Sequence, residues 1–95
     1  MKYFDWDAGE NALLKSKRDV CFEDAQRAIE EGGLLDTTDH PNKIKYPNQR
    51  IFVVRIKAYV YLVPFVEDEQ KVFLKTMFPS RKATKKYLLK RKEEK

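Results

Sequence analysis

Residues 51–78, IFVVRIKAYVYLVPFVEDEQKVFLKTMF, decide the predicted fold, because they divide into three strands joined by short turns. The first strand is rich in β-branched residues and apolar on both faces, as is typical of a central strand. Adjacent strands with connections this short form an antiparallel meander. The predicted strands are Ile51–Ile56, Tyr59–Val66 and Val72–Phe78. Pro64 cannot donate a ladder hydrogen bond, so we expect a bulge or an unpaired edge there.

The residues before this meander predict a short strand and two helices. Aromatic residues 3–6 form the strand, and Asp7 with Glu10 three positions later resembles a capping box that starts a helix ending near Arg18. Apolar residues at helical spacing, beginning with Phe22, predict a second helix that the paired glycines 32 and 33 terminate. Residues 34–36 form a short strand, and the polar stretch 37–49 is a long loop of the kind that often carries function.

Pro79 ends the last strand of the meander, and Ser80 is a good N-cap for a helix that runs from Arg81 to beyond Leu89. The chain of 95 residues suits one domain, residues 1–95. The predicted fold class is therefore α+β, with two amino-terminal helices on one face of an antiparallel sheet and a basic carboxy-terminal helix.

Composition excludes several classes of protein. No apolar run approaches the ~20 residues that cross a bilayer, and the acidic, aromatic amino terminus is unlike a signal peptide. Cys21 is the only cysteine, which favours a reducing cytoplasmic location and no disulfide framework. One Cys and one His argue against a structural zinc site, and we expect no metal and no cofactor. A weaker alternative is a metal site built on Asp36, Asp39 and His40, whose spacing matches no strong metal motif.

The positive charge is concentrated at one end of the chain. Residues 75–95 hold nine Lys or Arg and two Glu, a net charge of +7, whereas residues 1–74 hold eleven basic and thirteen acidic residues, a net charge of −2. Such a patch favours a polyanion, and RNA or DNA is the first candidate. The alternative is a solvated Lys-rich tail without a partner.

The last predicted helix begins with the wrong charge. The amino end of a helix is positive, so Arg81 and Lys82 in its first turn oppose the macrodipole. Lys82, Lys86 and Lys90 then follow at i, i+4 steps, with Lys85 beside them, and like charges at that spacing weaken a helix. A bound phosphate would compensate for these repulsions, which predicts a phosphate clamp and an RNA-binding helix. The alternative is that Arg81 folds back onto a carboxylate of the 67–70 turn or of the long loop.

Three segments, in order, carry a resemblance to a known family. "FDWDAGENALLKSKRDVCFEDA" (residues 4–25), "QRIFVV" (residues 49–54) and "PSRKATKKY" (residues 79–87) resemble the opening, the central strand and the closing segment of BrnT-type toxins. The matched features are a Trp-Asp pair leading a helix with Asn and Lys, a Phe-Glu-Asp-Ala helix start, an Arg at the start of the strand, and Arg-Lys-Ala-Thr near the end.

BrnT-type proteins belong to the RelE superfamily of type II toxin–antitoxin modules. The resemblance implies a RelE-like toxin and metal-independent endoribonuclease that cleaves RNA by 2′-hydroxyl attack and arrests translation. It also implies a ribbon–helix–helix antitoxin as partner. Carried across position by position, the matching basic residues are Lys15, Arg50, Arg81 and Lys82.

The cleavage chemistry needs a base, an acid and cations that stabilise the phosphorane. Arg50 and Arg81 are the candidate cations, because the arginine fork grips two phosphate oxygens. His40, the only histidine, is the candidate for proton transfer, with Tyr46 as another possible donor. Lys75 interrupts an apolar strand and faces either solvent or the site.

One segment departs from the family pattern. Family members often carry polar or ionisable residues on the strand that corresponds to Tyr59–Val66, where this chain has Val-Pro-Phe. A second hypothesis is therefore a non-catalytic RNA- or protein-binding module derived from the same fold.

Overall fold

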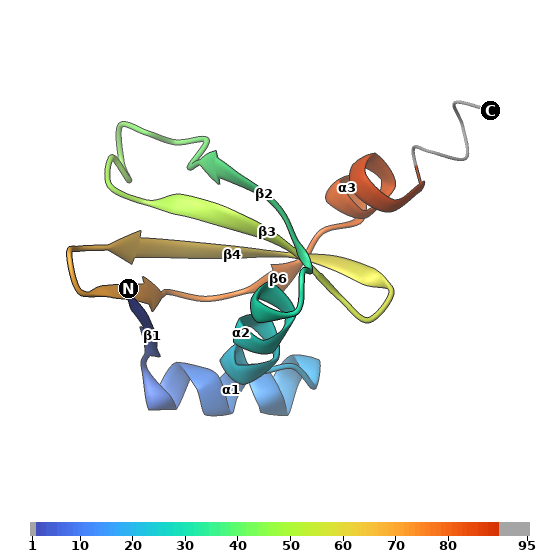
Figure 1. Cartoon of the computed structure of the whole chain (residues 1–95), viewed down its shortest axis with the longest axis horizontal. Coiled ribbons are helices and arrows are strands. Elements are labelled where there is room, and N and C mark those ends of the chain that lie inside the picture. The colour runs from blue at the N-terminus through green and yellow to red at the C-terminus, as the bar shows by residue number, and fades with distance from the viewer. Residues whose placement is uncertain (1, 90–95) are drawn as a thin grey trace.

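The computed structural model describes residues 2–89 and has an α+β fold, as the sequence predicts (Figure 1). The elements are β1 (Tyr3–Trp6), α1 (Ala8–Arg18), α2 (Phe22–Glu30), β2 (Leu34–Asp39), β3 (Arg50–Ile56), β4 (Tyr59–Glu67), β5 (Lys71–Leu74), β6 (Phe78–Pro79), α3 (Arg81–Thr84) and a π-helical turn (Lys85–Leu89).

The sheet is mixed, so the prediction of a wholly antiparallel sheet is wrong. Its strand order is β1-β5-β4-β3-β2, with the two-residue β6 pairing β4 as well. The meander β3-β4-β5 is antiparallel, but β1 pairs β5 in parallel. Two helices and three strands separate β1 from β5 in sequence, and a connection of that length allows parallel neighbours where a hairpin does not.

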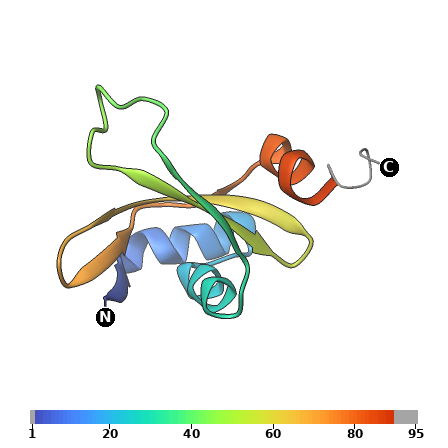
Figure 2. The ribbon, with the colours of Figure 1, turned by 45° about the horizontal axis from the view of Figure 1, so that its top comes forward.

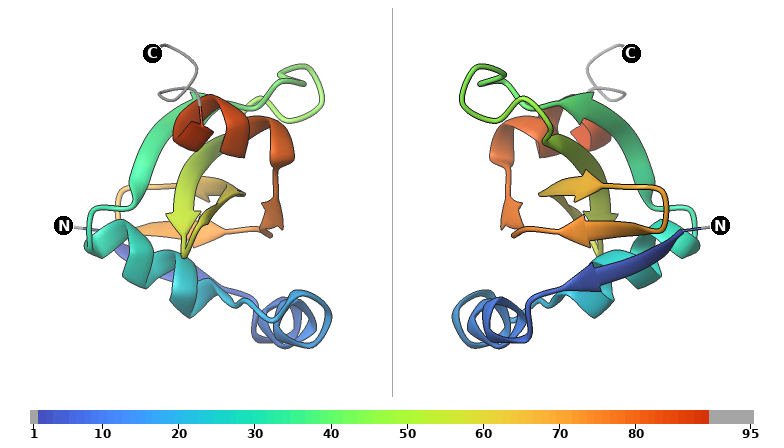
Figure 3. Two further views of the ribbon diagram at one scale, coloured as in Figure 1. Left: turned by 90° about the vertical axis from the view of Figure 1, so that its right-hand side faces the viewer. Right: turned by 90° about the vertical axis from the view of Figure 1, so that its left-hand side faces the viewer.

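Helices α1 and α2 cover one face of the sheet, here called the inner face (Figure 2). Between this face and the helices lies the main core, to which Phe22 and Ala25 of α2, Val54 of β3, and Val63 and Phe65 of β4 all contribute. The opposite, outer face carries α3 near one end, and the loop between β2 and β3 rises on the same side (Figures 2 and 3).

Polar side chains join the amino-terminal helices to each other and to the sheet. Asp7 caps α1 by accepting a hydrogen bond from the Glu10 N–H at 2.9 Å, as predicted. The Glu10 carboxylate, however, accepts a hydrogen bond from the Thr76 hydroxyl at 2.9 Å instead of completing a capping box. Asn11 accepts a hydrogen bond from the Phe22 N–H at 2.7 Å and thereby caps the start of α2.

Strand β2 is longer than the expected three residues and follows a tight turn after α2. Gly33 is needed at this turn, because a Cβ there would lie 2.9 Å from the Arg55 carbonyl oxygen and 3.0 Å from that of Ala28. The Gly33 N–H also donates to the Ala28 carbonyl at 2.7 Å. This close approach fixes how α2 leads into the sheet.

Pro64 interrupts the pairing along one edge of β4. Its pairing with Ile51 of β3 is unbroken, and its carbonyl accepts a hydrogen bond from the Lys75 N–H at 2.8 Å on the other side. In an antiparallel sheet the N–H and C=O of one residue point toward the same neighbouring strand. The position at which Pro64 lacks an N–H therefore faces β5 and β6, as its carbonyl does. On that side the predicted strand 72–78 is broken into β5 and β6. The three residues 75–77 lie opposite only two residues of β4, 63 and 64, so the strand that pairs with β4 carries a β-bulge.

After the bulge, α3 is fixed to the start of β4 by backbone and hydroxyl groups. The Ser80 N–H donates to the Val60 carbonyl at 3.0 Å, and the Ser80 side chain caps α3 by accepting from the Ala83 N–H at 3.0 Å. The buried Thr84 hydroxyl accepts a hydrogen bond from the Val60 N–H at 3.0 Å and donates one to the Ser80 carbonyl at 2.7 Å. These bonds satisfy backbone groups that the edge of β4 would otherwise leave unpaired.

Replacing Thr84 with Val tests this attachment. The variant keeps the shape of the side chain but leaves the buried Val60 N–H without its acceptor, so the free energy of unfolding should fall by about 1–3 kcal/mol. Urea denaturation measures the change, and Thr38→Val in β2 is the matched control, expected to stay within about 0.5 kcal/mol of the wild-type protein. Equal effects of the two substitutions would show that Thr84 is not the anchor.

Candidate nucleic-acid interface

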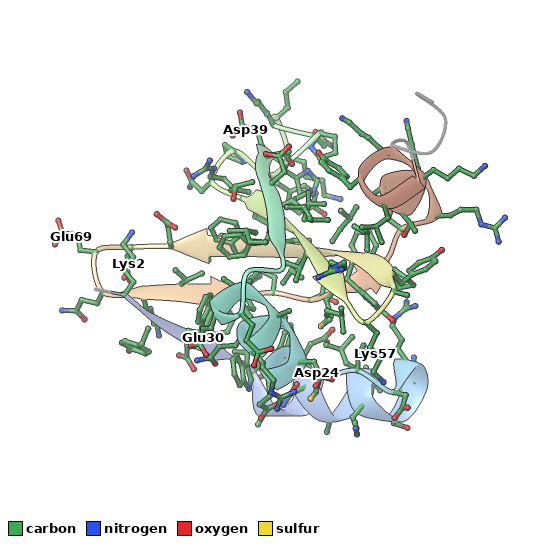
Figure 4. All side chains as sticks on the ribbon, turned by 45° about the vertical axis from the view of Figure 1, so that its right-hand side comes forward. Lys2, Asp24, Glu30, Asp39, Lys57 and Glu69 are labelled. Carbon is green, nitrogen blue, oxygen red and sulfur yellow. The ribbon has the colours of Figure 1, made fainter. Side chains whose placement is uncertain are left out.

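Four cations extend from the carboxy-terminal helical turns. They are exposed, and among residues 2–89 no carboxylate forms an ion pair with any of them. Long side chains project outward from α3, away from the sheet (Figure 4). We call this group the basic segment; it consists of Arg81, Lys82, Lys85 and Lys86.

The structure does not show the acidic turn holding Arg81. The turn after β4 lies at the opposite end of the sheet from α3, as the position of Glu69 shows (Figure 4). Glu67 instead pairs with Lys2 at 2.8 Å, and Asp68 accepts hydrogen bonds from backbone N–H groups within its own turn. The positive charge at the start of α3 therefore has no compensating carboxylate in the described part of the chain.

The basic segment does not form the continuous α-helix that the sequence predicts. The α-helix ends at Thr84, and residues 85–89 form a π-helical turn. A wider turn removes the exact i, i+4 stacking of Lys82 and Lys86 and reduces their mutual repulsion. The Lys86 ammonium lies 5.3 Å from the centre of the Tyr87 ring, a cation–π contact. Lys90, the next residue of the predicted stripe, lies outside the described residues.

A second attachment ties the π-helical turn to the sheet. The Tyr87 hydroxyl donates a hydrogen bond to the Asp36 carboxylate of β2 at 2.8 Å. This bond, with a smaller contribution from the Thr37 N–H, lowers the pKa of Asp36 below its ordinary value. The same bond raises the pKa of Tyr87, because the charged acceptor favours the protonated phenol. The carboxy-terminal turns are thus held at both ends.

The loop between β2 and β3 brings His40 and Tyr46 together. Their rings lie 4.6 Å apart between centroids, and both side chains are half-buried. Nδ1 of His40 accepts a hydrogen bond from the Asn42 N–H at 3.0 Å, which places the proton of a neutral ring on Nε2. The two candidate proton-transfer groups of the sequence therefore do share one site.

Arg50 lies at the base of the same loop but on the inner face. It stands directly opposite Phe65, whose side chain belongs to the core beneath the helices. Its Nε lies 3.8 Å from the Asp39 carboxylate, a loose ion pair between exposed side chains. Arg50 pairs with Phe65, whereas α3 is attached at Val60, five positions earlier in β4, so roughly 17 Å of strand separates the two places.

The structure consequently separates the two candidate catalytic arginines. Arg50 and Arg81 lie at opposite ends of β4, and the α3 attachment and Arg50 occupy opposite faces of the sheet. The two guanidinium groups do not converge on one phosphate in this conformation.

The remaining candidates are divided between the two faces. Lys15 lies on α1, 3.7 Å from Asp19 and beneath the inner face. Lys75 lies in the bulge on the outer face, with its ammonium 5.5 Å from the centre of the Phe73 ring. Of these two lysines, only Lys75 shares a face with the basic segment.

Residues 2–89 contain neither a metal-binding cluster nor a membrane-spanning helix. No group of three or more His, Cys, Asp or Glu there is placed to hold a metal ion. Asp36 and Asp39 of the weaker metal hypothesis point to opposite faces of β2, one toward Tyr87 and one toward Arg50. None of the described helices is long and apolar enough to cross a membrane.

No protein-family model matches this chain, and no curated protein matches it. The resemblance to BrnT-type toxins, the RelE-like arrangement and the cytoplasmic location therefore stay predictions.

Sequence reasoning missed the groups that position the basic segment. In the sequence, Thr84 stands out only as part of the Arg-Lys-Ala-Thr motif, although a Thr four residues after an N-cap serine can satisfy backbone groups on both sides. The Tyr87–Asp36 bond joins residues 51 positions apart, and no local pattern indicates such a pair. Asn11, which links the two helices, is indicated only by the family resemblance, because its bond to the Phe22 N–H spans eleven residues.

Replacing Tyr87 with Phe should raise the pKa of Asp36 toward its ordinary value, because the main cause of the lowered pKa is removed. A lowered pKa in the folded state stabilises the protein above the ordinary pKa, and this stabilisation is lost as the pH falls through the folded-state pKa. The variant should therefore lose part of the acid dependence of its stability. Carbon-13 NMR titration of the Asp36 carboxyl measures the change, with Tyr59→Phe as control. An unchanged pKa of Asp36 in the variant would show that the Tyr87 hydroxyl does not bond to Asp36 in solution.

Proposed function

We propose that this protein is an RNA-directed toxin of the type II class, an endoribonuclease that binds RNA through the basic segment. Four exposed cations on a segment attached by the Thr84 and Ser80 bonds support this proposal, and none of them forms an ion pair within the described chain, although Lys86 contributes to the lowered pKa of Asp36. Exposed cations on an ordered backbone attract a polyphosphate ligand, and their binding releases the counterions of that ligand.

The charge distribution supports RNA over a small anion. The cations extend over six residues, from Arg81 to Lys86, and the net +7 of residues 75–95 continues beyond them. A single phosphate would use only a fraction of that charge, whereas a nucleic-acid strand presents a phosphate at every nucleotide. The resemblance in the closing segment points to the same ligand.

Cleavage in this proposal belongs to the loop between β2 and β3. His40 and Tyr46 are the groups proposed for proton transfer, and Nε2 of His40 is not engaged by the Asn42 hydrogen bond. Arg50 lies at the base of the loop but on the inner face, so it stabilises a phosphate only where the RNA passes around this edge of the sheet. RNA bound along the outer face from α3 would extend toward this loop, which rises on the same side (Figure 3).

A second candidate, RNA binding without cleavage, is favoured by one specific observation. Arg50 and Arg81 are separated, and β4 between them carries Val63, Pro64 and Phe65 in place of polar groups. Incubating the purified protein with RNA in the presence of a chelator separates the candidates. Products with 2′,3′-cyclic phosphate ends that are lost in His40→Ala support the endoribonuclease, and intact RNA supports the binding module.

The partner in this proposal is an acidic segment of a ribbon–helix–helix antitoxin that covers the basic segment. Association of opposite charges should be fast and should slow as salt is added. Induction of this chain alone should arrest growth, and co-expression of the antitoxin should restore it. A complex that leaves the basic segment exposed would contradict neutralisation by direct coverage.

Removing two cations of the basic segment should weaken RNA binding in proportion to the charge lost. For Arg81→Ala with Lys82→Ala, the slope of log affinity against log salt should fall in magnitude by about 1.4, since each phosphate contact on single-stranded RNA adds about 0.7. The melting temperature should not fall, because neither residue has an ion pair in the described chain.

The matched control is Lys17→Ala with Arg18→Ala, the same two residue types at adjacent exposed positions of α1 on the other side of the sheet. This variant should keep the wild-type salt slope. If both pairs lower the slope equally, binding is non-specific attraction to net charge. If the first pair lowers stability and leaves binding intact, the cations are structural.

A further inference from the structure

The outer face has an uncovered part next to the basic segment. Val60, at the start of β4, is fully buried near α3, whereas Leu62 and Val66 on the same face are partly open, with the buried Pro64 between them. Leu62 stands directly opposite Phe78 of β6, and Val66 stands directly opposite Phe73 of β5. We call these four side chains the aromatic strip. Phe78 is the most open of them, with 36% of its surface exposed.

Two lysines lie beside Phe73 of the aromatic strip, and only the one nearer the basic segment is without an ion pair in the described chain. The Lys75 ammonium lies 5.5 Å from the centre of the Phe73 ring, and no carboxylate among residues 2–89 pairs with it. The Lys71 ammonium lies 5.7 Å from the same centre but is paired with Asp5 at 3.0 Å. Free positive charge therefore increases from Phe73 toward α3.

The other end of the aromatic strip is acidic, and its carboxylates Glu67 and Asp68 already have partners. A shallow open hollow of about 290 Å³ there is lined by Val66, Glu67, Asp68, Lys71 and Phe73. Glu67 is paired with Lys2, and Asp68 accepts the Gln70 and Lys71 N–H groups. A negatively charged backbone is repelled from this end and attracted toward Lys75 and α3.

We propose that the aromatic strip stacks unpaired bases of single-stranded RNA, with Phe78 as the principal stacking residue, while Lys75, Arg81 and Lys82 hold the phosphates. The inference rests on the proposed RNA binding and adds that the protein contacts the bases as well as the phosphates. Aromatic side chains beside a row of cations form the usual platform for single strands, because every base has a face that stacks. Duplex RNA buries its base faces and cannot use the platform.

The spacing along the chain fits one nucleotide held at two points. Arg81 follows Phe78 by three positions, a span of at most about 10 Å. Both belong to the segment that the Ser80 and Thr84 bonds attach to Val60, so their relative position is fixed before RNA binds. A preorganised pair of base and phosphate contacts loses less entropy on binding than a flexible tail does.

The test compares a short uridine oligonucleotide with an abasic oligomer of the same length and charge. The wild-type protein should bind the oligonucleotide about 5- to 100-fold more tightly than the abasic oligomer, the range that stacking of one base accounts for. Phe78→Leu should remove most of this difference and leave the salt slope unchanged, whereas Phe78→Trp should preserve it. The surface position of Phe78 means that both variants should keep the wild-type melting temperature.

The outcomes distinguish this inference from the proposed function. Salt-dependent binding that is equal for the oligonucleotide and the abasic oligomer overturns base stacking and leaves RNA binding by the basic segment intact. No binding of either oligomer at low salt overturns the proposed function and the inference with it. If Phe78→Leu leaves RNA binding unchanged but converts a self-associated protein to a monomer, the strip is a contact between copies of this chain and the inference fails.

Discussion

The absence of an N–H group on Pro64 determines how the outer part of this protein is built. At that residue the edge of β4 that faces β5 lacks a donor, and the partner strand responds with one extra residue at positions 75–77. Beyond the bulge the chain returns to β4 as β6, which brings Ser80 and Thr84 to the backbone of Val60. Without the bulge, the strand that begins as β5 would pair with β4 shifted by one residue, and Ser80 would not reach Val60 in the same way. The location of the basic segment is therefore a consequence of sheet pairing.

This attachment explains how a short helix can carry charges that oppose its own dipole. Four residues of α-helix are too few to be stable alone, and the cations of the first turn weaken it further. The two bonds of the Thr84 hydroxyl and the Tyr87–Asp36 bond hold the segment from both ends. Stability that comes from tertiary bonds leaves the surface charges free for a ligand. The protein thus separates the residues that hold the segment from those that we propose to bind RNA.

The fold was largely predictable from the sequence, and the site was predictable only in part. Alternating and β-branched residues predict β3 and β4 within about one residue, and Asp7 and Ser80 cap the helices as expected. The parallel pairing of β1 was missed, because strand partners far apart in sequence leave no local signal. The π-helical turn and the broken strand 72–78 were missed because tertiary bonds decide them. For the site, the structure shows that the cations Arg81 to Lys86 are exposed, and their role in binding stays a prediction. The separation of Arg50 from Arg81 leaves no local signal, because it depends on which residue of β4 each one lies beside.

Nitrogen-15 NMR of the intact protein with a short single-stranded RNA tests whether RNA binds the outer face along the basic segment and β6. We expect the amide signals of residues 75–87 to shift as RNA is added. The signals of α1 and of the acidic turn after β4 should stay in place, although they belong to the same small domain. Shifts concentrated on α1 and α2, with residues 75–87 unchanged, would show that RNA does not bind the outer face.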